Sequence, residues 1–176
     1  MGFRDAVRTC LRKYATFSGR ASRSEYWWFA LFLVLGSLVI GAVDSLLFGT
    51  SMVEVAPGQF ELRSNGPLAA IFSLAMLLPA LAAGWRRMHD SGRAGIYLLY
   101  PLIVMVGMLS FIGFLGGTEA LMTGDFGAIF AGVGGLIALL GAVVLLISPL
   151  LVLWWLTRPS QPGANAYGPN PQQVTS

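Results

Sequence analysis

The chain of 176 residues is poor in the residues that build most metal and catalytic sites. Its one cysteine, Cys10, cannot form an internal disulfide, and its one histidine, His89, leaves no thiol and imidazole cluster of the kind that binds zinc. We therefore predict no bound metal and no cofactor. Charge is also scarce, since Asp, Glu, Lys and Arg make up 11% of the chain, whereas a soluble domain carries about a quarter. These shortages argue against a soluble metalloenzyme and favour an integral membrane protein.

Long apolar runs are what the sequence has in abundance. Crossing a hydrocarbon core of roughly 30 Å takes about 20 apolar residues in a helix. Four segments are long enough, at residues 27–48, 67–85, 96–115 and 128–156. We therefore predict an all-α polytopic membrane protein with four transmembrane helices, in which residues 18–157 form the membrane domain. Gly134, Ala138 and Ala142 recur every four residues, which favours close helix packing within the molecule over a dimer interface.

The cations outside these segments predict how the chain is threaded. Ten of the 11 Lys and Arg residues lie before the first span, between the second and third, or after the fourth, and only Arg63 lies on the other side. By the positive-inside rule, both termini and the second connection are cytoplasmic. The formal net charge of +3 would also suit a nucleic-acid binder, but the cations cluster beside apolar spans. We therefore expect anionic lipid as the partner and no nucleic acid.

Residues 1–17 have the pattern of an amphipathic helix that lies on the cytoplasmic surface. Its apolar side chains share one face of a helical wheel: Phe3, Val7, Cys10, Leu11 and Tyr14. Its arginines share another face at four-residue intervals: Arg4, Arg8 and Arg12. Just beyond, Ser22 and Glu25 have the spacing of a capping box that starts the first span. The alternative is that the Glu25 carboxylate faces Arg87 or Arg93.

The opposite surface is predicted to carry a short periplasmic β-hairpin between the first two spans. Apolar residues alternate on both sides of Pro57 and Gly58, which suit a type II turn. This pattern places Glu54 opposite Glu61, with Arg63 on a diagonal where it relieves the repulsion.

Two further segments carry expectations of their own. Asp44 is the one acid within a span and lies near its outer end, where we expect it to reach water; a proton relay is the alternative. Residues 158–176 are Pro-rich and polar, which predicts a flexible cytoplasmic tail without a packed core.

One dense polar segment, which we call the octet, lies between the second and third spans. It reads Arg86, Arg87, Met88, His89, Asp90, Ser91, Gly92 and Arg93. An Arg or Asp at the centre of a membrane helix costs roughly 2.5 to 3.5 kcal/mol, so four such charges place the octet at a membrane surface. The positive-inside rule alone would account for its three arginines. It does not account for His89, Asp90 or the turn at Gly92.

Three runs of the chain, in order, resemble a known family. They are residues 17–29, which contain Arg20, Arg23 and Glu25 ahead of two tryptophans; residues 86–92 of the octet; and residues 162–168, with Gly163, Asn165, Tyr167 and Gly168. Together they resemble the bacterial inner-membrane family called domain of unknown function 805, over almost the whole chain. The resemblance implies a small polytopic protein of the bacterial inner membrane and no established activity. The chain departs from the family at residues 94–96, where Ala, Gly and Ile stand in place of the frequent Ser, Gly and Trp.

The first hypothesis for the octet is a binding site for the phosphate of an anionic lipid, because guanidiniums and helix-terminal amides both favour phosphate. The candidate residues are Arg86, Arg87, His89, Asp90, Gly92 and Arg93. A neighbouring candidate polar cluster consists of Arg20, Arg23 and Glu25. The alternative is a topogenic loop that binds nothing specific.

Three other functions stay open. His89 would serve a lipid-head-group enzyme as a general base if Asp90 or Glu25 oriented its ring, although no nucleophile motif accompanies it. A small transporter or channel is favoured only by the prolines Pro79 and Pro101 within spans. A protein partner at the cytoplasmic face is equally compatible with the pattern. We interpret the chain as a non-catalytic membrane protein whose octet contacts lipid or such a partner.

Overall fold

The computed structural model of the chain describes residues 1–56, 58–123 and 132–173. Its helices and strands are α1 (Phe3–Arg12), α2 (Arg23–Phe48), β1 (Thr50–Ala56), β2 (Gln59–Ser64), α3 (Leu68–Asp90), the 3-10 helix η1 (Gly95–Leu99), α4 (Tyr100–Thr123) and α5 (Gly132–Thr157). Four helical segments are long and apolar enough to cross a membrane. The predicted four spans and the hairpin between the first two are therefore confirmed.

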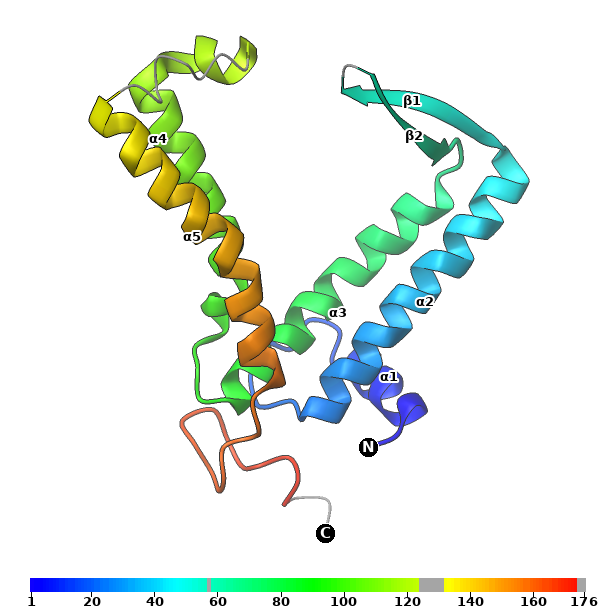
Figure 1. Ribbon diagram of the computed structural model, residues 1–176. Helices are drawn as coiled ribbons and strands as arrows, with labels where there is room; N and C mark the ends of the chain where they lie inside the picture. The colour runs from blue at the N-terminus through cyan, green and yellow to red at the C-terminus, as the bar shows by residue number, and fades with distance from the viewer. Residues whose placement is uncertain (57, 124–131, 174–176) are drawn as a thin grey trace.

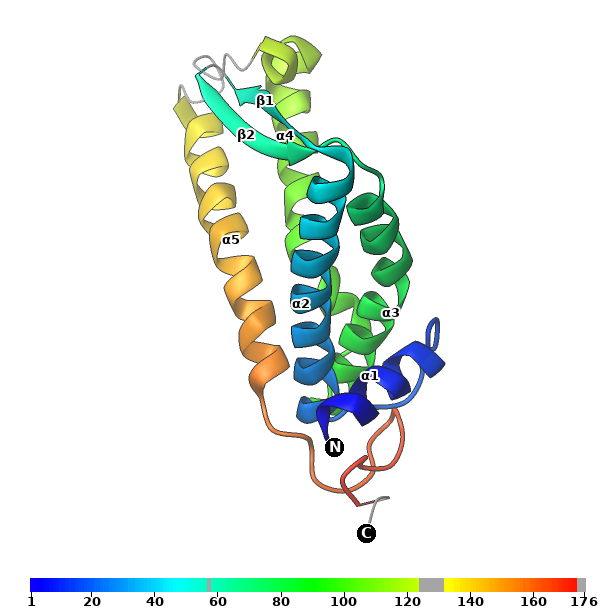
Figure 2. The same cartoon turned by 90° about the vertical axis from the view of Figure 1, so that its right-hand side faces the viewer.

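The spans form two helical pairs, α2 with α3 and α4 with α5 (Figure 1). The pairs converge at the end where both chain termini lie and diverge toward the end that carries the hairpin. Helix α1 crosses the converging end beside α2 and α3, as a view from the side shows (Figure 2). We call this end the polar end, because the octet, the tail and the N-terminal cations all lie there.

The buried apolar side chains also gather at the polar end, in two small clusters. One joins Cys10 of α1 to Phe29 of α2 and Ala83 of α3. The other joins Met88 of α3 to residues 152 and 156 of α5. Elsewhere the spans expose large apolar side chains, which suits helices that face lipid.

Several predicted boundaries move by a few residues. Helix α3 continues to Asp90 rather than ending at residue 85, so the first five octet residues are helical. The third span opens with a turn of 3-10 helix at Gly95–Leu99. The expected start of the fourth span at residue 128 lies outside the described residues. Ala138 of the small-residue series is buried in the molecule, in agreement with intramolecular packing.

The hairpin register differs from the predicted one. Val53 pairs with Glu61 and Glu54 pairs with Phe60, so the two glutamates are not opposite each other. An irregularity between Glu54 and Ala56 shifts the pairing by one residue, and such a shift moves every later side chain to a different partner. The Glu54 carboxylate instead accepts a hydrogen bond from the Gly58 amide at 2.9 Å. The predicted turn type involves Pro57, which is outside the described residues.

Asp44 was expected to reach water, and it does not. Its side chain is fully buried. Its two oxygens accept hydrogen bonds from the backbone amides of Leu68 and Ala69 at 3.0 and 3.3 Å. Because Pro67 precedes α3 and has no side chain that could cap it, Asp44 of α2 supplies the cap across the hairpin. The Asp44 carboxylate is therefore occupied by helix capping and is not free for the proton relay that was the alternative.

Candidate functional site

The polar end contains a buried cluster of five charged residues from three segments of the chain. We call it the polar knot; it consists of Arg20, Glu25, Arg86, Arg87 and Asp90. Arg86, Arg87 and Asp90 are 0% exposed. These three side chains are enclosed by protein, because helix α3 carries them inward against the N-terminal segment and the tail.

Asp90 is the centre of the knot. Its Oδ1 atom accepts from Nε of Arg20 at 3.0 Å, and its Oδ2 atom accepts from Nη1 of Arg87 at 2.7 Å. Ser160 of the tail donates to the same Oδ2 at 2.5 Å. One carboxylate therefore forms ion pairs with two buried guanidiniums and also binds the tail, which meets the requirement that a buried charge be paired.

Arg86 is the third buried cation of the knot and connects α3 to the N-terminal segment. Its Nη2 atom donates to the Glu25 carboxylate at 3.2 Å and its Nη1 atom donates to the Thr16 carbonyl at 2.6 Å. Its own backbone carbonyl accepts from the Ala21 amide at 3.0 Å. The predicted capping bond from the Glu25 amide to Ser22 Oγ is present at 3.2 Å, so Glu25 both starts α2 and pairs an arginine. That arginine is Arg86, whereas the sequence suggested Arg87 or Arg93.

Cys10 lies beside this pair and is fully buried. Its thiol is 3.8 Å from Glu25 Oε1. Burial, and then the nearby Glu25 carboxylate, raise the pKa of the Cys10 thiol to about 12. A thiol in this environment is a poor nucleophile, because the thiolate is the reactive form.

Arg87 caps the end of the last span. Its Nε atom donates to the Leu156 carbonyl at 3.0 Å, and its Nη2 atom donates to the Arg158 carbonyl. The final carbonyls of α5 have no amide partner within the helix, so a guanidinium here satisfies them and complements the negative end of the helix dipole. Arg87 thus joins the two helical pairs at the polar end.

The tail, which was expected to be flexible and to lack a packed core, makes hydrogen bonds to the knot. Arg20 donates from Nη1 to the Gly163 carbonyl and from Nη2 to the Gln161 carbonyl, both at 2.7 Å. The side-chain amide of Asn165 donates to the His89 carbonyl at 2.9 Å. The prolines of the tail do not prevent these hydrogen bonds to the knot, because the backbone carbonyls that accept them need no regular secondary structure.

His89 stacks on a tail tyrosine rather than pairing with an acid. Its ring lies 3.8 Å from the Tyr167 ring, with an interplanar angle of 4°. Its Nδ1 atom is 3.0 Å from the Gly19 carbonyl oxygen. Among the described residues, neither Asp90 nor Glu25 contacts the imidazole, so the orienting carboxylate that the enzyme hypothesis required is not present there.

The remaining candidates lie outside the knot. Gly92 forms the predicted turn with φ 77°, but the Gln161 side chain packs over its α-carbon. The Arg93 guanidinium lies over the Trp155 ring at 5.3 Å from its centre. Arg23 is exposed beside Trp27 and Thr157. The structure therefore brings together Arg20, Glu25 and part of the octet, and separates Arg23 and Arg93 from them.

Sequence reasoning missed the residues that the tail contributes, namely Ser160, Gln161, Asn165 and Tyr167. The signal for two of them was present, because Asn165 and Tyr167 belong to the third run that resembles the family. That run indicates the family, but it does not by itself place these two residues against the octet. Across the part of the chain that the structure describes, no group of three or more His, Cys, Asp and Glu residues is placed to hold a metal ion.

The fold and the knot define a multi-pass membrane protein whose two helical pairs are joined by buried ion pairs at one end. The chain belongs to the family described as protein of unknown function, DUF805, whose model matches residues 14–169. It is 34% identical over 104 residues to inner membrane protein YhaH of Escherichia coli K12, covering 59% of this chain and 78% of that protein. It is 32% identical over 104 residues to inner membrane protein YhaI of the same strain, covering 59% and 76%. No solved structure gives a significant match. The chain is thus a multi-pass inner-membrane protein.

Proposed function

We propose that this protein is a non-catalytic inner-membrane protein, with both termini in the cytoplasm, that contacts anionic lipid head groups through the cations that the polar knot leaves exposed. The observation that supports the proposal is the division of the cations into two sets. Arg20, Arg86 and Arg87 are buried and bonded to protein oxygens. The second set is exposed at the same end of the molecule and comes from the N-terminal part of the chain: Arg4, Arg8, Arg12, Lys13 and Arg23. Two further cations, Arg93 and the exposed Arg158, lie over the rings of Trp155 and Trp154.

This division changes where lipid is expected to bind. The buried guanidiniums already donate to carboxylates and carbonyls, and the one buried donor among the described side chains that has no partner, Nε of Arg86, is enclosed by protein. A lipid phosphate could reach these groups only if the knot opened, which would leave buried charges unpaired. An exposed cation near an anionic surface contributes about 1 kcal/mol, and five of them are enough to hold the polar end at the head groups. The octet therefore has a structural role, and the N-terminal cations have the lipid-binding role.

The proposed orientation follows from the same division. The cations at the polar end outnumber those at the hairpin end, where Arg63 forms an exposed pair with Glu61 at 3.5 Å. The positive-inside rule then assigns the polar end to the cytoplasm and the hairpin to the periplasm.

Orientation is tested by labelling single cysteines in cells, in a Cys10→Ser background. A membrane-impermeant thiol reagent should label Ser51→Cys in the hairpin without permeabilisation of the inner membrane. It should label Ala164→Cys in the tail only after permeabilisation. The reverse pattern would reject the proposed orientation.

Lipid contact is tested by recovering the protein from native membranes together with its lipids and any protein partner. We expect anionic phospholipid to be enriched over the bulk membrane. A variant in which the five exposed cations are replaced by Gln should lose that enrichment, whereas Arg158→Gln, which removes a cation lying over Trp154, should keep it. Enrichment that survives the five substitutions would overturn the proposal, and stoichiometric recovery of a protein in place of lipid would favour the partner alternative.

A further inference from the structure

A shallow, open apolar groove of about 570 Å³ runs along helix α1 and is bounded on α2 by Phe32. Four apolar side chains line it: Phe3, Val7, Leu11 and Phe32. Three arginines complete the lining: Arg4, Arg8 and Arg12. No described residue that lines the groove is acidic.

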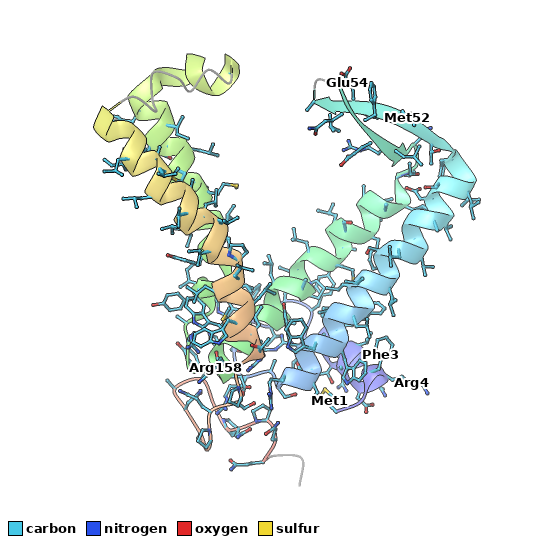
Figure 3. All side chains as sticks on the ribbon, in the orientation of Figure 1. Met1, Phe3, Arg4, Met52, Glu54 and Arg158 are labelled. Atoms are coloured by element: carbon cyan, nitrogen blue, oxygen red, sulfur yellow. The ribbon has the colours of Figure 1, made fainter. Side chains whose placement is uncertain are left out.

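The walls of the groove are held by aromatic packing. The Phe3 ring meets the Trp28 ring edge to face, with centres 5.9 Å apart. On α2, the rings of Phe29 and Phe32 stack with centres 5.8 Å apart. Cys10 of α1 is buried against Phe29 of α2, and Val7 and Phe32 pack against the same cluster, so this contact fixes α1 on α2 beside the groove. Figure 3 shows Phe3 and Arg4 on the side of α1 that faces away from α4 and α5.

The arginines that border the groove are available for a ligand. All three are exposed, and none of the three guanidinium groups forms a hydrogen bond or ion pair with another described residue. Their four-residue spacing separates successive arginines by about 6 Å along the helix axis, so that they form one cationic row. Like charges in such a row repel one another and are stabilised by a shared anion.

From this combination of an apolar groove and a cationic row we infer that α1 and α2 form a binding site for one anionic phospholipid, with an acyl chain in the groove and the phosphate on the arginines. The inference rests on the proposed function and deepens it, because surface attraction alone requires cations but no groove. The occupant is a phospholipid rather than a free phosphate ester, since a phosphate ester leaves the apolar walls exposed to water. A detergent-like chain without charge would leave the arginines unpaired.

The test measures binding of phosphatidylglycerol and phosphatidylcholine of matched chain length to the purified full-length protein by native mass spectrometry. Arg4, Arg8 and Arg12 are replaced together by Gln, which removes charge and keeps the groove. Val7→Trp fills the groove and keeps the charge; Leu11→Trp is a second filling variant in case the first does not fold. Arg158→Gln is the control for a cation outside the groove. Glycerol 3-phosphate is the competitor that carries the phosphate without a chain.

We expect the wild type to prefer phosphatidylglycerol and to bind long chains more tightly than short ones. Each arginine should contribute about five-fold, so the triple variant should bind on the order of 100-fold more weakly. A filled groove should bind about 10-fold more weakly and lose the dependence on chain length, whereas the control and glycerol 3-phosphate should change nothing.

The outcomes separate this inference from the proposed function. If the triple variant loses binding while both filling variants fold and keep the dependence on chain length, the groove site is wrong and lipid contact by surface charge stands. If the triple variant binds phosphatidylglycerol as the wild type does, this site is wrong. Competition by glycerol 3-phosphate at the affinity of the lipid would also overturn it, because the chain would then contribute nothing.

Discussion

The hydroxyl of Tyr14 donates a hydrogen bond to the backbone carbonyl of Ala75, which is the carbonyl that Pro79 leaves without a partner in helix α3. An amide at residue 79 would normally bond to this oxygen, and proline has none. The same solution recurs in α5, where Ser148 Oγ donates at 2.9 Å to the carbonyl of Leu145, four residues before Pro149. Both prolines are therefore tolerated in membrane spans because a side-chain hydroxyl bonds to the freed carbonyl.

Tyr14→Phe should therefore destabilise the protein by about 1 kcal/mol and loosen the N-terminal segment from α3. Thermal unfolding in detergent measures the first effect and hydrogen exchange of α1 the second. Tyr97→Phe is the matched control, since Tyr97 packs on Trp155 through its ring and donates no hydrogen bond to a described residue.

A double-mutant cycle sharpens this prediction. Pro79→Ala supplies an amide for the Ala75 carbonyl, so Tyr14→Phe should cost less in that background than in the wild type. Equal cost in both backgrounds would show that Tyr14 does not act through the freed carbonyl.

Asp90→Asn should be among the most damaging single substitutions. It leaves the buried guanidiniums of Arg20 and Arg87 without their shared countercharge, which costs about 3 to 5 kcal/mol. Glu61→Gln breaks an ion pair whose side chains are 63% and 62% exposed, and it should cost about 1 kcal/mol or less. If Asp90→Asn and Glu61→Gln unfold at the same midpoint, the structural role of the knot is wrong.

The tail should detach when its ring contact is removed. Tyr167→Ser removes the stack on His89, worth about 0.5 to 1.5 kcal/mol, whereas Tyr167→Phe keeps it. Limited proteolysis should therefore cleave the tail of the Ser variant faster than that of the wild type or the Phe variant. If the Phe variant is cleaved as fast as the Ser variant, the stack does not hold the tail.

Gly66→Ala should disturb the junction between the hairpin and α3. A β-carbon at residue 66 would lie 2.0 Å from the Asp44 carboxylate, so the cap on Leu68 and Ala69 must shift. We expect a loss of about 1 to 2 kcal/mol, the usual cost of a lost cap. Gly41→Ala is the control, because a β-carbon there meets nothing within 4 Å and alanine favours the helix. Equal stability of the two variants would show that Asp44 does not cap α3.

The Cys10 thiol should resist alkylation in the folded protein. Because its pKa rises from 9.0 to about 12, the thiolate fraction at pH 8 is lower by about 1,000-fold, and burial adds to the protection. The raised pKa also means that the stability contributed by the neutral thiol is complete below pH 9 and declines as the pH rises toward 12. Alkylation rates before and after unfolding measure the effect, and fast labelling of the folded protein would contradict it.

The four spans and the hairpin could be predicted because hydrophobic length and residue alternation are local properties of the chain. The octet could be located for the same reason. Its environment could not, since Asp90 binds Arg20 across 70 positions of sequence and no local pattern records that pairing. The predicted hairpin register was wrong because of a single irregularity between Glu54 and Ala56, which the alternation of apolar residues does not reveal.

By itself, the sequence determined that this protein belongs in a membrane, how many times it crosses, and at which end its positive charge collects. These properties follow from transfer free energies that each residue brings with it. Only the tertiary structure decided which arginines are buried and which are exposed at the polar end. That division depends on the positions of Asp90, Glu25 and the carbonyls of α5 and the tail, because a guanidinium can be buried only where folding places acceptors around it.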